Sequence, residues 1–349
     1  MHKPALYLIS TAGSYTGGER SMAILCQKLS SRFSVHFRGI NEKIHPEIEP
    51  ILEKCAVDIE MGLPHAVELP EGGHALIHCH EYAMRFKIDV DLWRRKLSKL
   101  ATVQMIFNVD MAGVYHFDWL ADNLTGVYFE NHSPLRIWKG FSRNRALANT
   151  RCVVLPPPLD INPFLQIDIT QSAERKIIGR LAGHAPMPTG FKVFYENLFE
   201  RLPEWQFWFM TTANELREAF EGHPRVRLLR DDELTPVKFL ESVDFICYPL
   251  RDHWPANGPR SLVESVAAGH AVVTVDRAGP KERVQHGESG FLANSLERMA
   301  DYVVQLANDP GLRLTMGRRA KQLASTYNIM DWVDEIEIGT HAKPASQCH

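Results

Sequence analysis

Long apolar runs, paired cysteines and an excess of charge of one sign are all missing from this chain. No stretch approaches the roughly 20 consecutive apolar residues that a membrane-spanning helix needs. Near the start, Ala5–Ile9 is too short an apolar run for a secretory signal peptide. The net charge of −3 creates no overall field that would attract nucleic acid or anionic lipid. We therefore expect a cytoplasmic protein, either free or peripherally bound at a membrane.

The six cysteines are scattered and include no C-x-x-C pair; they are Cys26, Cys55, Cys79, Cys152, Cys247 and Cys348. Most lie in apolar runs, where a reduced cysteine behaves as a small hydrophobic residue. This spacing argues against a zinc ribbon and against a disulfide framework, and it fits a reducing compartment.

Two histidines, His78 and His80, lie two residues apart at the end of an apolar run. A strand would place both on one face, which is a geometry that a metal ion could use. No third ligand follows at a suitable spacing, so we expect no metal. His80 is predicted instead to contact a substrate at the end of the strand.

The chain is long enough for two domains, and both halves alternate short apolar runs with amphipathic stretches. Its 349 residues are 45% hydrophobic and 23% charged, which is typical of a globular protein with a sizeable core. The alternation indicates α/β domains with parallel sheets. Two successive halves of this kind predict a ligand cleft beyond their strand ends.

The boundary between the halves lies at three prolines, Pro156–Pro158, which form a stiff segment unable to continue a helix or a central strand. We predict Rossmann-like domains over residues 1–155 and 170–326, with a linker over 156–169. A last helix over 327–338 is expected to cross back to the first domain. Residues 339–349 are expected to form a disordered tail.

The segment from Tyr248 to Gly290 carries the clearest chemistry. A strand ends at Tyr248, a polar loop follows, and a helix then begins around Pro259 with Asn257 as its expected cap. A helix N-terminus at a cleft offers unpaired N–H groups and a positive dipole to a phosphate. Glu264, just over one turn inside this helix, can accept hydrogen bonds from the two hydroxyls of a ribose. The segment therefore predicts a nucleotide site.

This segment resembles the family 4 group of retaining GT-B glycosyltransferases, which are of the glycosyl transferases group 1 type. Its matching stretches are Gly258–Gly269, Ala271–Val273, Gly279–Glu282 and His286–Gly290. Other family-like pieces stand in the right order, at Gly17–Arg20, Leu159–Phe164, Gly179–Leu181 and Asp309–Ala324. The resemblance spans nearly the whole chain and is strongest over residues 245–327. It implies two Rossmann-like domains facing a cleft, with an acceptor-side domain first and a nucleotide-sugar donor domain second.

The resemblance also implies roles for individual residues. Glu264 corresponds to the glutamate that binds the ribose hydroxyls, and Arg180 to the arginine that contacts the donor diphosphate. Gly17 and Gly18 correspond to the loop that closes over the phosphates, where glycine lets the backbone approach closely. The residues expected to lie beside the sugar and phosphate at the start of the helix are Asn257, Gly258, Pro259 and Arg260.

Two positions depart from the family pattern. The first glutamate of the E-x7-E motif is replaced by Ala256, which leaves the choice of donor sugar open. The lysine that contacts the phosphate is missing from its usual place, because residues 183–188 look like an insertion and Thr189 precedes the glycine. Lys192 and Arg260 are the alternative sources of the positive charge that a departing diphosphate needs.

The mechanism implied is transfer with retained configuration, in which the leaving phosphate deprotonates the acceptor. Positioning and electrostatics then carry most of the catalysis. No cofactor or metal is expected, and the co-substrate is a nucleotide diphosphate sugar, with UDP the commonest carrier in the family. The histidine that the family places after an N-domain strand has its nearest counterpart at residues 108–110. Asp110 is therefore an acceptor-side candidate for a catalytic role beside His80.

Three functions remain open at this point. The first is transfer of a hexose-type sugar to a glycan or a lipid-linked acceptor. The second is transfer to hydroxymethylated bases of phage DNA, because a basic stretch could attract either DNA or an anionic membrane; it contains Arg136, Lys139, Arg143, Arg145 and Arg151. The third is a degenerate, non-catalytic protein that binds a nucleotide sugar, which Ala256 and the missing lysine would explain.

Overall fold

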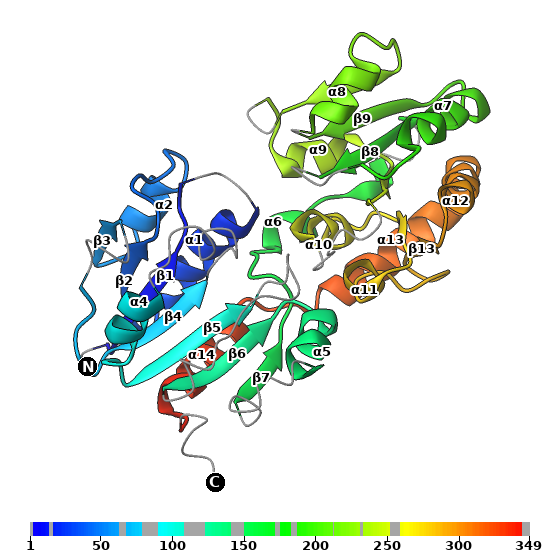
Figure 1. Ribbon diagram of the computed structural model, residues 1–349. Helices are drawn as coiled ribbons and strands as arrows, with labels where there is room; N and C mark the ends of the chain where they lie inside the picture. Colours follow the sequence, from blue (N-terminus) through cyan, green and yellow to red (C-terminus); the bar gives the residue numbers. More distant parts are fainter. Residues whose placement is uncertain are drawn as a thin grey trace. The chain divides into compact units, whose positions relative to one another are not determined.

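The computed structural model describes residues 3–13, 17–62, 68–78, 90–107, 123–140, 150–171, 175–182, 187–211, 213–230, 233–251 and 259–343. The chain folds into two compact units (Figure 1). The first unit contains Met1–Leu159 together with Asn328–His349, and the second contains Asp160–Tyr327. Each unit has its own sheet and its own hydrophobic core.

Unit 1 is built on a sheet of seven strands that all run parallel. In spatial order the strands are β3 (Asp58–Met61), β2 (Ser34–Gly39), β1 (Ala5–Ser10), β4 (His74–His78), β5 (Thr102–Phe107), β6 (Leu124–Phe129) and β7 (Arg151–Val154). The direction of winding reverses between β1 and β4, where Ser10 lies opposite His78. Ligands bind at such a reversal in open α/β sheets, outside the carboxyl ends of the strands.

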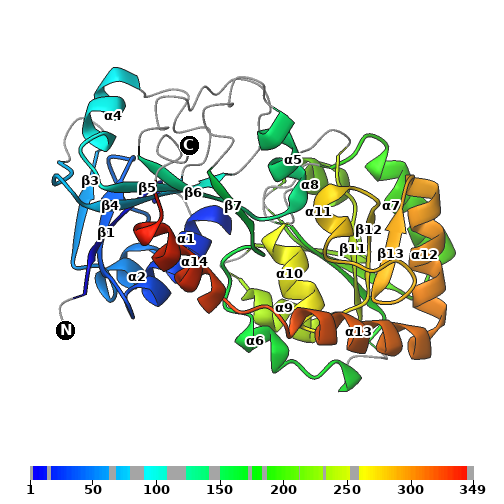
Figure 2. The ribbon, with the colours of Figure 1, turned by 90° about the horizontal axis from the view of Figure 1, so that it is seen from below.

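Helices cover both faces of the first sheet (Figure 2). One face carries α1 (Gly17–Leu29), α2 (Glu49–Glu53) and α14 (Met330–His341), which pack with Leu6, Leu8 and Phe37. The other face carries α4 (Val90–Leu97) and α5 (His132–Gly140), which contribute Leu97 and Trp138 to a second cluster. Burial on both faces explains why the central strands are nearly continuous apolar runs.

The last helix, α14, belongs to unit 1. Its Trp332 is 1% exposed, and the indole Nε1 donates a hydrogen bond to the carbonyl of Pro156 at 2.8 Å. The amide of Gln104 on β5 donates to the carbonyl of Ile336 at 3.0 Å. Arg32, just after α1, forms an ion pair with Asp334 at 2.6 Å. The predicted return of the last helix to the first domain is confirmed.

The end of α14 differs from the prediction. The helix runs to His341 rather than ending at residue 338, and Gly339 and Thr340 are buried. A Cβ at position 339 would lie 2.2 Å from Oε1 of Gln104, and the hydroxyl of Thr125 donates to the Gly339 carbonyl at 2.8 Å. The prediction of a disordered tail was therefore wrong for residues 339–341, because a glycine allows the helix to pack closely against the sheet.

Unit 2 is built on six parallel strands. In spatial order they are β10 (Val226–Leu229), β9 (Gln206–Met210), β8 (Ile177–Leu181), β11 (Phe245–Tyr248), β12 (Val272–Val275) and β13 (Gly290–Ala293). The winding reverses between β8 and β11, which places the carboxyl ends of these two strands side by side.

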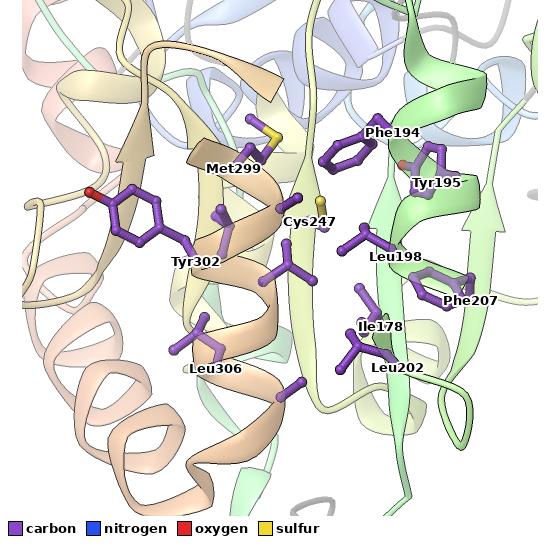
Figure 3. Packing of buried hydrophobic residues seen from close by; sticks show 14 of the residues in the cluster. Ile178, Phe194, Tyr195, Leu198, Leu202, Phe207, Cys247, Met299, Tyr302 and Leu306 are labelled. Atoms are coloured by element: carbon purple, nitrogen blue, oxygen red, sulfur yellow. The ribbon is translucent and has the colours of Figure 1, made fainter. Parts of the chain in front are cut away.

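The helices of unit 2 are α6 (Asn162–Leu165), α7 (Phe191–Arg201), α8 (Asn214–Phe220), α9 (Pro236–Ser242), α10 (Arg260–Ala267), α11 (Ala278–Lys281), α12 (Leu296–Asn308) and α13 (Pro310–Ala324), with a 3₁₀ turn at Ile169–Gln171. Helices α7 and α12 cover one face of the sheet, and their apolar side chains meet Ile178 of β8 and Cys247 of β11 (Figure 3). Both units thus confirm the predicted α/β class with two Rossmann-like domains.

Candidate functional site

The reversal of winding in the second sheet brings together a cation and an aromatic ring. Arg180 lies on β8 and is fully buried, with an exposed fraction of 0%. Its guanidinium carbon lies 5.6 Å from the ring centroid of Tyr248 on β11, which is a cation–π distance. An arginine side chain is positively charged, so this place in the sheet carries a fixed positive charge.

Tyr248 connects this cation to the helix that follows. Its hydroxyl accepts a hydrogen bond from Ser261 at 3.4 Å, and its backbone carbonyl accepts one from the hydroxyl of Thr274 at 3.0 Å. Burial raises the pKa of Tyr248, and the nearby Arg180 opposes that rise. The phenol therefore stays protonated and links the end of β11 to the first turn of α10.

Helix α10 carries the predicted carboxylate. Its apolar residues Leu262, Val263 and Val266 are buried in the core of unit 2. Glu264 is 3% exposed, and its Oε1 accepts a hydrogen bond from Nε of Arg260 at 2.8 Å. The structure thus brings these two predicted residues together one helical turn apart.

The position of α10 depends on two glycines at its carboxyl end. Gly269 terminates the helix with a φ of +88°, a left-handed conformation that glycine adopts without strain. On α13, a Cβ at Gly317 would lie 2.0 Å from the carbonyl oxygen of Gly269. The absence of side chains lets the two helices touch through their backbones, so α10 has little freedom to move.

The start of α10 presents backbone donors. Pro259 stands at the N-cap position and provides no side-chain cap. The carbonyl of Pro259 accepts a hydrogen bond from the amide of Leu262 at 2.9 Å. Among the first N–H groups of a helix, those without an intrahelical partner attract anions, and the helix dipole adds to this effect. Asn257 and Gly258, which were predicted beside Pro259, lie outside the described residues, as does Ala256.

The sequence did not predict a set of polar contacts that holds the backbone after β11. The guanidinium of Arg277 donates to the carbonyls of Leu250 and Arg251, each at 2.8 Å. Arg251 pairs with Glu215 at 2.5 Å and donates to the carbonyl of Met187 at 3.0 Å. These contacts join residues far apart in the chain, so no local pattern marks them. They fix the backbone directly after β11.

The two alternative sources of phosphate-binding charge differ in their surroundings. Lys192 lies on α7, its side chain is 60% exposed, and its ammonium pairs with Glu196 at 3.9 Å. The side chain of Arg260 is 12% exposed and lies against Glu264. Of the two, Arg260 is the one that the structure brings into contact with the candidate ribose carboxylate.

Of the residues predicted for the site in unit 1, the structure describes Gly17 and Gly18. Gly17 and Gly18 begin α1, after a turn in which the amides of Ala12 and Gly13 donate to the side-chain oxygen of Asn41 at 2.9 and 3.1 Å. At the reversal of winding, where unit 2 has Arg180, unit 1 has a buried polar pair. The hydroxyl of Ser10 and Nδ1 of His78 are 3.1 Å apart. His80 and Asp110 lie outside the described residues.

The basic stretch is only partly available as a charged surface. Arg136 and Lys139 are exposed on α5, whereas Arg151 forms an ion pair with Glu335 of α14. Arg143 and Arg145 lie outside the described residues. Within the described ranges, no helix is long and apolar enough to cross a membrane, and no group of three His, Cys, Asp or Glu side chains could hold a metal ion.

Comparisons with known proteins concern the second unit and the fold as a whole. Residues 175–309 match the family model described as glycosyl transferases group 1. The fold is similar to that of HepE from Anabaena in complex with UDP-glucose, with a TM-score of 0.71 and 14% identity over 96% of this chain and 98% of that one. It is also similar to a sucrose-phosphate synthase from Thermosynechococcus elongatus, with a TM-score of 0.69 and 11% identity over 97% and 98% of the two chains.

A third similar structure is a glycosyltransferase from Rickettsia africae, with a TM-score of 0.69 and 12% identity over 100% of both chains. A comparison with curated protein sequences gave no match. The structural likenesses show that the chain has the GT-B fold. Together with the family match over unit 2, they define the class of the protein, which is a glycosyltransferase.

Proposed function

We propose that this glycosyltransferase takes its sugar from a nucleotide diphosphate sugar bound in unit 2 around Glu264 and Arg180. The single observation that carries this proposal is the buried carboxylate of Glu264, one turn inside α10, on the strand-end side of a sheet that also buries Arg180. A site for a nucleoside diphosphate needs acceptors for the ribose hydroxyls and positive charge for the phosphates. Unit 2 offers both on neighbouring elements.

Glu264 is the proposed ligand of the ribose. A carboxylate has two oxygens and about four lone-pair positions, so the bond from Arg260 to Oε1 leaves capacity for two hydroxyl donors. Hydrogen bonds to a charged group are worth about 1.5–3 kcal/mol, and a buried site strengthens them. Burial also means that the cost of desolvating this carboxylate is already met in the free protein.

The diphosphate is proposed to face Arg180, Arg260 and the first turn of α10. Arg180 contributes a fixed charge that the core of unit 2 holds in place. Arg260 contributes a second charge, whose position is set by Glu264. The N-terminal amides of α10 add oriented dipoles without any mobile ion. Negative charge that develops on a leaving diphosphate would be stabilised by these groups.

The reaction proposed is a transfer with retained anomeric configuration. The bond between the anomeric carbon and the diphosphate oxygen breaks, and the acceptor oxygen bonds to that carbon on the same face. The acceptor proton passes to a phosphate oxygen of the leaving group. The protein then has to position the two substrates and stabilise charge, which is the chemistry that this set of arginines, amides and one carboxylate can supply.

UDP is the proposed nucleotide and a hexose the proposed sugar. HepE, whose fold is similar, was solved with UDP-glucose, with UDP and glucose, and with UDP. For the acceptor we propose a glycan or a lipid-linked hydroxyl. Transfer to DNA is less well supported, because Arg151 is paired with Glu335 and a DNA acceptor needs several phosphate contacts.

The test is a panel of UDP-, GDP- and ADP-sugars, with the unfolding midpoint and donor hydrolysis both measured. At least one nucleotide sugar should raise the midpoint, and its hydrolysis should depend on Glu264. If none binds, the donor site is wrongly assigned. Tight binding with no hydrolysis and no transfer to any acceptor would identify the chain as a non-catalytic binding protein.

A further inference from the structure

Two cysteines that are far apart in the sequence meet in unit 1. Cys26 lies on α1 with an exposed fraction of 0%, and Cys55 follows α2 and is half-buried. Their sulfur atoms are hydrogen-bonded to each other at 3.2 Å, although the residues are separated by 29 positions. Both are free thiols. The absence of a C-x-x-C motif hid this pair, because the contact depends on the packing of α1 and α2.

The backbone around Cys55 is held firmly by local hydrogen bonds. The amides of Cys55 and Ala56 both donate to the carbonyl of Leu52, at 3.0 and 2.7 Å, and the amide of Val57 donates to Val35 on β2 at 2.7 Å. Leu52 and Cys26 belong to the same buried cluster. A sulfur–sulfur bond is about 2.05 Å long, so the two sulfur atoms, now 3.2 Å apart, have to approach by only about 1.1 Å for a bond to form.

The two thiols differ in acidity in a way that gives them different chemical roles. The hydrogen bond between the two sulfur atoms lowers the pKa of Cys55, burial opposes this effect, and the amide of Ala56 lowers the pKa further. The pKa of Cys26 is raised by its bond to Cys55 and by burial. A thiolate is the reactive form of cysteine, and access to solvent decides which thiol reacts first. Cys55 has both properties, whereas Cys26 is placed to react second.

We propose that Cys26 and Cys55 are a redox modification site. A small-molecule disulfide such as oxidised glutathione oxidises the two thiols, which then form a reversible intramolecular disulfide. The Cys55 thiolate attacks one sulfur of the oxidant and releases one glutathione thiolate. Cys26 then attacks the Cys55 sulfur of the mixed disulfide, its proton leaves with the second glutathione, and the Cys26–Cys55 bond forms. Two protein thiols are oxidised and one disulfide of the oxidant is reduced. The bond joins α1, which begins at Gly17, to the segment that leads into β3.

The test treats the folded, full-length chain with oxidised glutathione, then unfolds it in denaturant, blocks free thiols with a maleimide and maps the peptides by mass spectrometry. The expected product is one cross-linked peptide pair containing Cys26 and Cys55, with both residues protected from the maleimide. Cys247 is the internal control, because it is 1% exposed and burial raises its pKa to about 12. It should stay unmodified by the oxidant.

Two variants separate a true pair from accidental oxidation. In Cys26→Ser, Cys55 should accumulate as a stable mixed disulfide with glutathione, because the second thiol is missing. In Cys55→Ser, Cys26 should stay reduced, because the buried thiol has no reactive partner. A wild-type chain in which Cys55 keeps its glutathione, or in which both thiols remain open to the maleimide after oxidation, would overturn the proposal. Neither result depends on transferase activity.

Discussion

The two sheets reverse their winding at equivalent places, between β1 and β4 in unit 1 and between β8 and β11 in unit 2, but the side chains there differ in kind. Unit 1 places the hydroxyl of Ser10 against the imidazole of His78. Unit 2 places the guanidinium of Arg180 against the ring of Tyr248. One fold therefore presents hydrogen-bonding groups without permanent charge in one half and a fixed cation in the other.

This difference matches the two substrates that a glycosyltransferase must handle. A nucleotide sugar carries a diphosphate and needs positive charge, which we propose that Arg180 and Arg260 provide beside Glu264. An acceptor hydroxyl is neutral and needs groups that accept or donate a hydrogen bond. Both units have the same kind of fold, so the fold itself only provides a binding site at the strand ends. The residues at the strand ends decide which ligand each unit binds.

The strongest way to break the comparison is to remove the cation of unit 2. Arg180→Met keeps a long, unbranched side chain in the core and removes the charge. We expect kcat/KM for the donor to fall about 100- to 1,000-fold, because one fixed group that stabilises the leaving diphosphate is lost. The measurement is steady-state transfer or donor hydrolysis, with circular dichroism to verify folding. Arg230→Ala, at an exposed arginine paired with Glu233, is the matched control. Equal activity in the two variants would remove Arg180 from the site.

A second prediction concerns the ribose carboxylate. Glu264→Ala should weaken nucleotide binding by about 1.5–3 kcal/mol, or roughly 10- to 150-fold in Kd, because hydrogen bonds to a charged group are lost. Calorimetric titration with UDP measures it. Glu241→Ala removes an exposed carboxylate of the same unit, one that pairs with Lys238, and should leave Kd unchanged. An unchanged Kd in Glu264→Ala would exclude the ribose assignment.

A third prediction sharpens the contrast between the units. His78→Gln, in unit 1, should raise KM for the acceptor about 3- to 10-fold through a lost or displaced hydrogen bond, while the Kd for UDP stays the same. Ser10→Ala removes the partner of His78 and should change acceptor KM in the same direction. The readout is the split between donor affinity and acceptor KM. If His78→Gln weakened UDP binding instead, the division of labour between the units would be wrong.

The smallest effect is expected at Lys192. Its ammonium is exposed and paired with Glu196, so Lys192→Ala should change donor kcat/KM by about twofold at most. Arg260→Ala should lower it by more than tenfold, because it removes the charge that we propose to face the phosphates and leaves Glu264 buried without this partner. Activity assays on the two variants decide whether Lys192 or Arg260 supplies the positive charge that the missing lysine would otherwise provide. A larger loss in Lys192→Ala would reverse the assignment.

The fold, and the contact at the centre of the proposed donor site, could be predicted because their determinants are local. The apolar runs marked the parallel strands, and the i to i+4 spacing of Arg260 and Glu264 placed them on one helix turn. Arg180 was recognisable only through the family resemblance, by its place in the stretch Gly179–Leu181. These features depend on neighbours in the chain, which a sequence displays directly.

The rest depends on contacts between distant segments. Arg277 holds the carbonyls of Leu250 and Arg251, and no spacing in the sequence signals a bond across 26 residues. The same is true of Cys26 and Cys55, whose contact follows from the packing of two helices. The extra turn of α14 depends on the fit of Gly339 against Gln104, which only the three-dimensional packing reveals.

The most direct test of the donor site is an experimental structure of the chain with UDP. The ribose hydroxyls should lie within hydrogen-bonding distance of the Glu264 carboxylate, about 2.5–3.0 Å between oxygen atoms. The diphosphate should face Arg180, Arg260 and the first turn of α10. A UDP molecule bound elsewhere in the chain, with Glu264 still paired only with Arg260, would contradict the assignment.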